Sequence, residues 1–187
     1  MVKKILITGA NGFLGSAITK LGIKKGYKVS ILVRKNSNLI NLKPLLSKLK
    51  VHYGNLEDIE SLNQPIKDND VIFHVAADYR LWSRKPAEIY AANVLGTENI
   101  ALKTLTHNKI LIYTSSVATL KLKKDFISDE NSEAKFDDMV GDYKKSKFLA
   151  EKIISSFIKK KKLKGIIVNP STPIGEGDIK PTPTGKI

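Results

Sequence analysis

Cysteine is absent from the sequence, which excludes disulfide bonds, thiolate catalysis and metal sites with cysteine ligands. The only three histidines, His52, His74 and His107, lie far apart without the spacing of zinc ligands, so we expect no metal. No apolar run approaches the roughly 18 residues that a membrane span needs. Glycines interrupt the apolar stretch that begins at Ile5, which argues against a signal peptide. We therefore expect a cytoplasmic protein without a membrane span.

Arginine is also scarce, although the formal net charge is +14. Arg34, Arg80 and Arg84 are the only arginines, and almost all of the positive charge comes from lysines spread along the chain. Nucleic-acid sites usually combine arginine forks with clustered aromatic side chains. We interpret the lysine excess mainly as the coding bias of an AT-rich genome and expect no nucleic-acid partner. A basic surface that attracts phosphates or anionic membranes is the alternative.

The 187 residues allow one domain, or one domain and a piece of another. Apolar runs rich in β-branched residues predict six strands, at Val2–Thr8, Tyr27–Val33, Lys50–Tyr53, Val71–Val75, Ile110–Ser115 and Gly165–Asn169. Helical patterns lie between them at Phe13–Lys24, Leu39–Leu49 (irregular at Pro44), Pro86–Thr106 and Asp142–Lys160. This alternation predicts an α/β fold, in which helices cover both faces of a doubly wound parallel sheet.

A glycine-rich motif, TGANGFLG at Thr8–Gly15, separates the first predicted strand from the first helix. Glycine lets the chain turn tightly and lets a pyrophosphate approach the backbone, and the helix N-terminus offers N–H groups to the phosphates. Between a strand and a helix, this motif indicates a Rossmann-type dinucleotide site, with a plain structural turn as the alternative. The candidate cofactor contacts here are Gly9, Asn11, Gly12, Phe13, Leu14 and Gly15.

The end of the second predicted strand bears on the choice of cofactor. In a site for NAD, an acidic residue about 20 positions after the glycines binds the ribose 2′-hydroxyl. This sequence has Arg34 followed by Lys35, with no acidic residue nearby. A guanidinium pairs with a 2′-phosphate in a fork geometry, so we favour NADP over NAD. An exposed arginine at a strand end is the alternative.

Four polar residues predict a site of proton transfer. Tyr143 and Lys147 are four positions apart at the start of a predicted helix, and therefore lie on one face. A nearby ammonium would lower the pKa of the phenol, so that Tyr143 exchanges a proton with a substrate oxygen. Ser116 follows the fifth strand and could hydrogen-bond the same oxygen, and Asn93 is a polar candidate in the long helix. Taken singly, a packed tyrosine and a polar helix face are the simpler interpretations.

Together these residues resemble the extended short-chain dehydrogenase/reductase superfamily along the whole chain. Longer strings are similar to the hopanoid-associated sugar epimerase family, which is close to the dihydroflavonol reductases. They are FHVAADYRLW (Phe73–Trp82), YTSSVATL (Tyr113–Leu120), YKKSKFLAE (Tyr143–Glu151), VNPSTPIG (Val168–Gly175) and DIKPTPTG (Asp178–Gly185).

The resemblance implies roles for individual residues. Ser116, Tyr143 and Lys147 would form a catalytic triad supported by Asn93, and Lys147 would also hold the nicotinamide ribose. Asp78–Trp82 would face the substrate. Further cofactor contacts would come from Asn55, Leu56, Val75, Ala76, Ala77, Pro170, Ser171 and Thr172. Such families usually have an aspartate where this chain has Asn55, which accepts the same adenine hydrogen bond without the charge, so adenine binding would be weaker.

The resemblance also implies a domain organisation and a function. Residues 1–175 would form a dinucleotide-binding Rossmann domain, and residues 176–187 would begin a truncated substrate-binding segment, because members of the superfamily continue into a C-terminal substrate domain. The implied function is an NAD(P)-dependent epimerase/dehydratase or reductase. It would transfer a hydride at a carbonyl or hydroxyl carbon of a small-molecule substrate, a sugar nucleotide or related compound, in hopanoid biosynthesis. The alternatives are a non-catalytic dinucleotide-binding module or an inactive gene fragment. A homodimer stays open.

Overall fold

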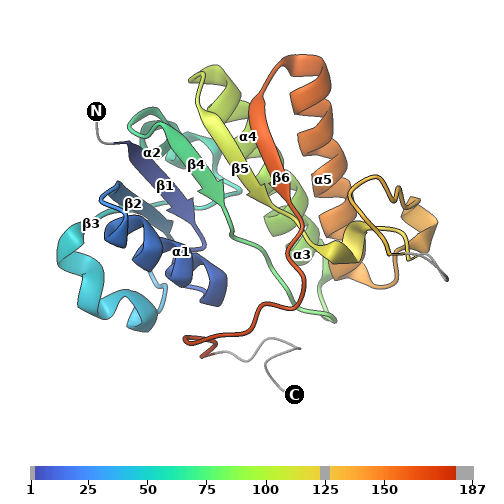
Figure 1. Ribbon diagram of the computed structural model, residues 1–187, viewed down its shortest axis with the longest axis horizontal. Helices are drawn as coiled ribbons and strands as arrows, with labels where there is room; N and C mark the ends of the chain where they lie inside the picture. Colours follow the sequence, from blue (N-terminus) through green and yellow to red (C-terminus); the bar gives the residue numbers. More distant parts are fainter. Residues whose placement is uncertain (1–2, 123–126, 180–187) are drawn as a thin grey trace.

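The computed structural model describes residues 3–122 and 127–179, and a single sheet organises them (Figure 1). Its six strands are all parallel in the order β3-β2-β1-β4-β5-β6. They are β1 (Lys4–Thr8), β2 (Lys28–Val33), β3 (Leu49–Tyr53), β4 (Val71–His74), β5 (Ile110–Thr114) and β6 (Lys164–Val168). The doubly wound α/β fold predicted from the alternating pattern is therefore confirmed.

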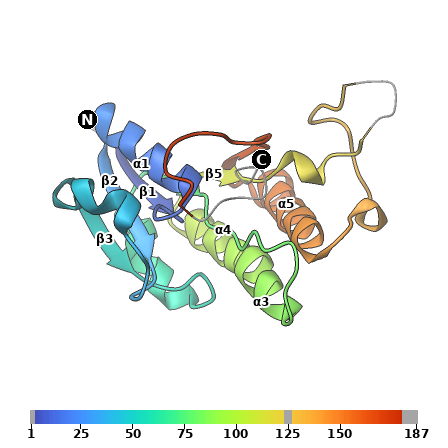
Figure 2. The same ribbon diagram turned by 90° about the horizontal axis from the view of Figure 1, so that it is seen from below.

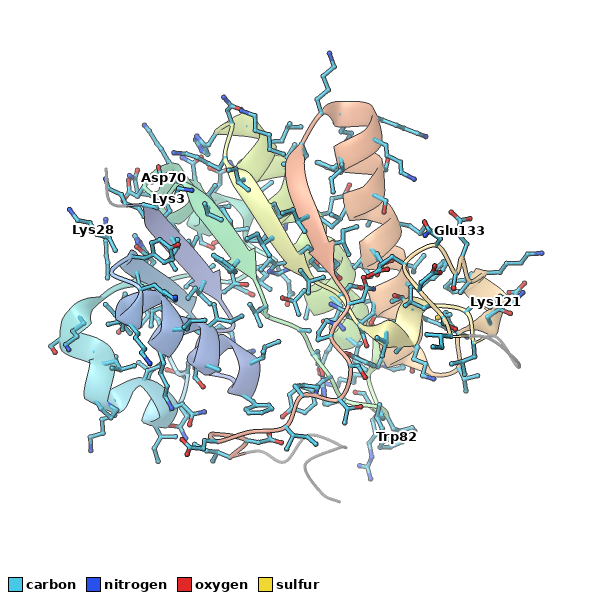
Figure 3. The ribbon with its side chains drawn as sticks, in the orientation of Figure 1. Lys3, Lys28, Asp70, Trp82, Lys121 and Glu133 are labelled. Atoms are coloured by element: carbon cyan, nitrogen blue, oxygen red, sulfur yellow. The ribbon has the colours of Figure 1, made fainter. Side chains whose placement is uncertain are left out.

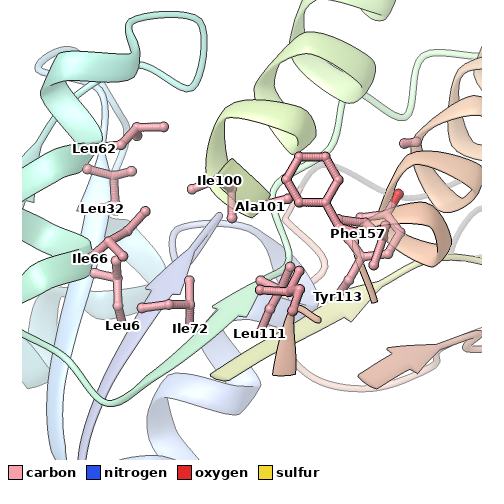
Figure 4. Packing of buried hydrophobic residues seen from close by; sticks show 13 residues of the cluster. Leu6, Leu32, Leu62, Ile66, Ile72, Ile100, Ala101, Leu111, Tyr113 and Phe157 are labelled. Atoms are coloured by element: carbon pink, nitrogen blue, oxygen red, sulfur yellow. The ribbon is translucent and has the colours of Figure 1, made fainter. Parts of the chain in front are cut away.

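Helices cover the two faces of the sheet unequally (Figures 1 and 2). One face packs on α1 (Phe13–Lys24) and the 3₁₀ helix η1 (Ile40–Lys48), and the apolar cluster there belongs mainly to β1 and β2. The other face packs on α2 (Asn63–Lys67), α4 (Gly96–Thr106) and α5 (Asp142–Lys161). Figure 4 shows this second cluster, in which Leu6, Ile72 and Leu111 of three neighbouring strands meet Ile100 of α4 and Phe157 of α5.

The predicted helix Pro86–Thr106 differs from the structure in its middle. The chain follows α3 (Pro86–Tyr90), one wider π-helical turn η3 (Ala91–Leu95) and then α4. A π-helical turn inside a helix often marks a functional site, and this one carries the candidate Asn93. The i, i+4 pattern that predicted one regular helix contains no signal for the extra residue of a wide turn.

A second difference is a helical segment that was not predicted, η2 (Ile59–Leu62) followed by α2. Asp58 caps it, because its side chain accepts hydrogen bonds from the backbone N–H groups of Glu60 and Ser61 at 3.1 and 3.4 Å. Two further short 3₁₀ helices follow β5, namely η4 (Val117–Thr119) and η5 (Phe136–Asp138). No helix in residues 3–122 and 127–179 is long and apolar enough to cross a membrane.

Candidate active site

All six strands end at one edge of the sheet, which we call the carboxyl edge. Four segments that follow strands meet there: the glycine motif after β1, residues 75–82 after β4, residues 115–120 after β5 and residues 169–175 after β6. Figure 3 shows Trp82 at this edge, while Lys3, Lys28 and Asp70 lie at the opposite edge. Trp82 is 73% exposed, so its indole is available to a ligand. In sheets of this type, ligands bind at this edge.

The glycine motif needs glycine at two positions. Gly9 has a positive φ of 70°, and a Cβ added there would lie 2.7 Å from Cα of Ala76 at the end of β4. A Cβ on Gly15 would lie 2.1 Å from the carbonyl oxygen of Gly9. The two glycines therefore let the loop close against both α1 and the neighbouring strand.

The first turn of α1 is open to an anion. Gly12 is the N-cap residue and has no side chain with which to cap the helix, and the first turn holds no acidic residue. Ser16 turns its hydroxyl back to the carbonyl oxygen of Phe13 at 2.8 Å. Backbone N–H groups at a helix N-terminus bind phosphate, so the geometry can hold the pyrophosphate of a dinucleotide.

Arg34 and Asn55 follow the ends of neighbouring strands, β2 and β3. Arg34 is exposed, and its charge reaches Asp78. Burial acts to raise the pKa of the Asp78 carboxyl, but hydrogen bonds from Arg80 and the charges of Arg80 and Arg34 bring that pKa below its ordinary value. The Asn55 side chain accepts a hydrogen bond from the backbone N–H of Glu57 at 3.4 Å. Their roles toward a cofactor stay predictions.

Ser116 and Tyr143 meet at the carboxyl edge. Ser116 directly precedes η4, and Tyr143 lies in the first turn of α5. Burial raises the pKa of the Tyr143 phenol, and a hydrogen bond with the Ser116 side chain partly offsets this effect. The structure therefore brings together two residues that the sequence assigned to one substrate oxygen, and their catalytic role stays a prediction.

Lys147 lies one helical turn after Tyr143 but points elsewhere. Its Nζ donates hydrogen bonds to the Tyr113 hydroxyl at 2.9 Å and to the Thr114 carbonyl at 2.7 Å, both on β5. Nζ also lies 4.5 Å from the centre of the Tyr113 ring. The expectation that Lys147 lowers the pKa of Tyr143 is wrong for this arrangement, because burial dominates at Tyr143 and the ammonium is directed at β5.

The pKa of the buried Lys147 ammonium lies well below that of an ordinary lysine. Lys147 is 2% exposed, and burial lowers its pKa to about 7, against a smaller opposing effect from the charge of Glu151. Beside it, burial and the charge of Lys147 lower the pKa of His74 to about 3, so this imidazole is neutral at pH 7. His74 bridges the Thr8 and Thr97 hydroxyls at 2.8 and 3.0 Å, which accounts for a structural role.

Asn93 links the loop after β4 to α5. Its Oδ1 accepts a hydrogen bond from the N–H of Asp78 at 2.6 Å, and its Nδ2 donates to the Asp78 carbonyl at 2.8 Å and to the Ser146 hydroxyl at 3.0 Å. Asn93 is 2% exposed, so these bonds satisfy an amide that is otherwise cut off from water. The residue therefore holds the frame around Tyr143 and Lys147.

The remaining predicted contacts fall into two groups, one near the glycine motif and the end of β3, and the other near Ser116. The Ala76 N–H donates to the Thr8 hydroxyl at 3.3 Å, which sets Val75, Ala76 and Ala77 beside the glycine motif. The Leu56 carbonyl accepts from Asn99 at 2.9 Å near the end of β3. The Pro170 carbonyl accepts from the N–H of Val117 at 3.3 Å, which sets the segment Pro170, Ser171 and Thr172 beside Ser116. Most of the string Asp178–Gly185, from residue 180 onward, lies outside the described residues.

Sequence reasoning missed the polar side chains that surround Ser116. The Glu151 carboxylate accepts hydrogen bonds from the side chains of Ser115, Thr119 and Asn169. A signal was present, because Tyr143, Lys147 and Glu151 repeat every four positions and so share a face of α5. The donors could not be found in this way, since Ser115 and Asn169 follow two different strands and Thr119 ends η4.

Comparisons with known sequences find relatives along most or all of the chain. A family model described as the NAD dependent epimerase/dehydratase family matches residues 5–187. A putative dihydroflavonol 4-reductase from Synechocystis is 39% identical over 189 residues, which cover 100% of this chain and 54% of that protein. A 2-alkyl-3-oxoalkanoate reductase from Shewanella oneidensis is 31% identical over 155 residues, which cover 82% of this chain and 38% of that protein.

Solved structures also resemble this chain over nearly its whole length. The crystal structure of gox2253 superposes with a TM-score of 0.92 at 42% identity, over 98% of this chain and 56% of that chain. The UDP-glucose 4-epimerase of Thermus thermophilus in complex with NAD superposes with a TM-score of 0.84 over 97% of this chain and 59% of that chain. Its identity of 18% shows a shared fold alone. The chain spans about half the length of the relatives it matches.

Proposed function

Because the chain belongs to the NAD-dependent epimerase/dehydratase family, we propose that it uses NADP(H) to transfer a hydride at a carbonyl or hydroxyl carbon of a small molecule. The observation that carries this proposal is the meeting of Ser116 and Tyr143 at the carboxyl edge, beside a buried Lys147. A module that only binds a dinucleotide has no need for a buried ammonium and a paired phenol at this edge, because both are costly to desolvate.

The nicotinamide would supply the hydride, and this chain's residues would handle the proton. Burial keeps the Tyr143 phenol protonated at neutral pH, which suits a proton donor to a substrate carbonyl oxygen. Ser116 would donate a hydrogen bond to the same oxygen and stabilise the negative charge that develops there. Lys147 would hold the nicotinamide ribose with its ammonium.

The preference for NADP rests on Arg34. An exposed guanidinium at the end of β2 can pair with a 2′-phosphate, and neither Arg34 nor Lys35 has an acidic neighbour in sequence that would accept from a free 2′-hydroxyl. The first turn of α1 would hold the pyrophosphate. Asn55 would accept from the adenine amine, with NAD as the alternative cofactor.

The substrate class is the finer part of the proposal. The two reductases named above support a carbonyl substrate. A sugar nucleotide, as in an epimerase, and a role in hopanoid biosynthesis rest on the resemblance of sequence strings alone. A cytoplasmic homodimer likewise stays a prediction.

The test follows deuterium from NADPH labelled at nicotinamide C4 into a panel of ketones and nucleotide sugars. It uses the chain alone and the chain fused to the C-terminal part of the Synechocystis relative, which is about twice as long. We expect substrate-dependent transfer in at least one form, and at least ~10²-fold slower transfer in Tyr143→Phe. Tight NADPH binding without transfer in either form would instead support a non-catalytic dinucleotide-binding module.

A further inference from the structure

Glu151 occupies a position that neither the sequence motif nor the proposed chemistry assigns. It lies on α5 one helical turn after Lys147 and two turns after Tyr143, on the same face. One carboxylate oxygen, Oε2, accepts hydrogen bonds from the Thr119 hydroxyl and the Asn169 amide, both at 2.9 Å, and from the Ser115 hydroxyl. Within the described residues, no lysine or arginine forms an ion pair with it.

The three donors come from three different segments. Ser115 follows β5, Thr119 ends η4 and Asn169 follows β6. Hydrogen bonds to an ionised acceptor are roughly twice as strong as neutral ones. A single oxygen therefore fastens both ends of the turn that contains Ser116, and fastens that turn to α5.

The peptide of Ser116 lies between the Asn169 amide, which has a proton for it as well as one for Glu151, and the Thr119 hydroxyl, whose single proton is shared between Glu151 and the Ser116 carbonyl. The Ser116 carbonyl accepts from the Asn169 amide at 3.1 Å and lies 2.7 Å from the Thr119 hydroxyl. The Ser116 hydroxyl oxygen accepts from the N–H of Ala118 at 3.1 Å. That N–H uses a lone pair of the hydroxyl and leaves the hydroxyl proton available to the Tyr143 phenol, whose pKa the Ser116 side chain lowers.

Glu151 also acts on Lys147 through its charge. The groups that face the ammonium are Tyr113 and Thr114 on β5, His74 on β4, and Glu151 on its own helix. Burial lowers the pKa of Lys147 to about 7, and the negative charge of Glu151 opposes that decrease. Tyr113 and Thr114 favour the charged ammonium through hydrogen bonds, and His74 is neutral at pH 7. The Glu151 carboxylate is therefore the only one of these groups that adds a negative charge.

We propose that Glu151 is a positioning residue of this site: its carboxylate sets the turn Ser115–Thr119 so that the Ser116 hydroxyl meets Tyr143, and its charge, one helical turn from Lys147, opposes the loss of the Lys147 proton. The proposal rests on the function proposed above for Ser116, Tyr143 and Lys147. A glutamate that only fastened α5 to the sheet would stabilise the fold without affecting either residue.

The experiment uses NMR on the 187-residue chain to follow the protonation of Lys147 and the hydrogen bonding of Tyr143. The ¹⁵Nζ signal gives the titration midpoint of Lys147, and the ¹³Cζ shift of Tyr143 at pH 7 reports hydrogen bonds to its phenol oxygen. Glu151→Gln removes the charge, whereas Glu151→Asp keeps the charge but shortens the reach by one methylene. Thr119→Val removes one donor and leaves the carboxylate. Glu98→Gln, at an exposed position of α4, is the matched control for the loss of a charge.

We expect Glu151→Gln to lower the Lys147 midpoint by about half a pH unit or more and to shift the Tyr143 signal. Glu151→Asp should keep the Lys147 midpoint near its wild-type value but shift the Tyr143 signal. Thr119→Val should shift the Tyr143 signal and leave the Lys147 midpoint unchanged. Glu98→Gln should change neither. If Glu151→Gln lowers stability and leaves both signals in place, Glu151 only fastens the fold and the proposal is wrong.

The role proposed for Glu151 and the function proposed above can fail independently, because different measurements test them. If Glu151→Gln fails to fold, Thr119→Val decides, and an unshifted Tyr143 signal in that variant overturns the proposal. Neither readout needs a substrate. Normal hydride transfer in Tyr143→Phe would therefore overturn the proposed function, even if both NMR shifts occurred as expected.

Discussion

The two ends of the candidate site are built in different ways. At the glycine motif, backbone atoms make the site, and Gly9 and Gly15 serve by having no side chain where one would meet backbone at 2.7 and 2.1 Å. At Ser116 and Tyr143, side chains make the site, and each depends on partners from other strands and helices. The first end therefore depends on one loop and on the backbone beside β4, whereas the second depends on side chains from α5 and from the segments after β5 and β6.

The largest expected effect would break the backbone-built end. In Gly15→Ala, the new methyl group would meet the Gly9 carbonyl and Cα of Ala10, at 2.1 and 2.9 Å, and neither backbone atom can move aside freely. We expect a loss of about 2 kcal/mol or more in the free energy of unfolding, and no measurable NADPH binding by calorimetry. Gly175→Ala is the control, because a methyl group there has only ordinary contacts at 3.7 Å. Equal NADPH affinity in the two variants would contradict the assignment.

The next effect would break the side-chain end and leave the other intact. Tyr143→Phe removes the phenol proton and should slow hydride transfer at least ~10²-fold in the form of the protein that shows turnover. The dissociation constant for NADPH should change little, because in the proposed binding mode the phosphates and the adenine would contact the other end. A parallel loss of cofactor affinity would show that the two ends are not separable in this way.

The preference for NADPH over NADH tests a side chain, Arg34, that would add to the backbone contacts at the glycine motif. Arg34→Ala would remove the proposed charge-assisted contact to the 2′-phosphate, which we expect to contribute about 1.5–3 kcal/mol, or roughly a tenfold to hundredfold preference. We expect calorimetry to show weaker NADPH binding in this variant and nearly unchanged NADH binding. Wild-type protein that binds NADH as tightly as NADPH would overturn the assignment of Arg34.

The smallest effect at each step of the measurement concerns Lys147 and appears as a gradual pH dependence of the free energy of unfolding. Burial lowers the pKa of Lys147 to about 7, and an unfolded lysine titrates near 10.4. Between these values the unfolded chain binds more protons than the folded chain, so stability from this group rises with pH by about 1 kcal/mol per pH unit. Urea unfolding at pH 7, 8 and 9 should show this slope in wild type but not in Lys147→Met. Identical slopes would mean that Lys147 is not buried as an amine near pH 7.

The sequence predicted the fold and the backbone-built end because both depend on local patterns. α1 was predicted at the residues where it occurs, and all six strands were predicted within a few residues. The π-helical turn at Asn93 was missed, since the partners of this side chain lie in the loop at Asp78 and on α5, far from it in sequence. The direction of the Lys147 side chain was missed for a similar reason. Its partners Tyr113 and Thr114 belong to β5, and no spacing along α5 reveals them.

The central claim is that both ends bind one dinucleotide, and an NMR titration of the chain with NADPH tests it most directly. We predict that the backbone amides of Gly12, Phe13 and Leu14 and the ¹⁵Nζ signal of Lys147 shift along one binding curve with a single dissociation constant. The adenosine half alone, 2′,5′-ADP, should shift the amides and leave Lys147 unchanged. If NADPH shifted the amides at the glycine motif but not Lys147, the nicotinamide end would not reach the Ser116 and Tyr143 pair, and the account would be wrong.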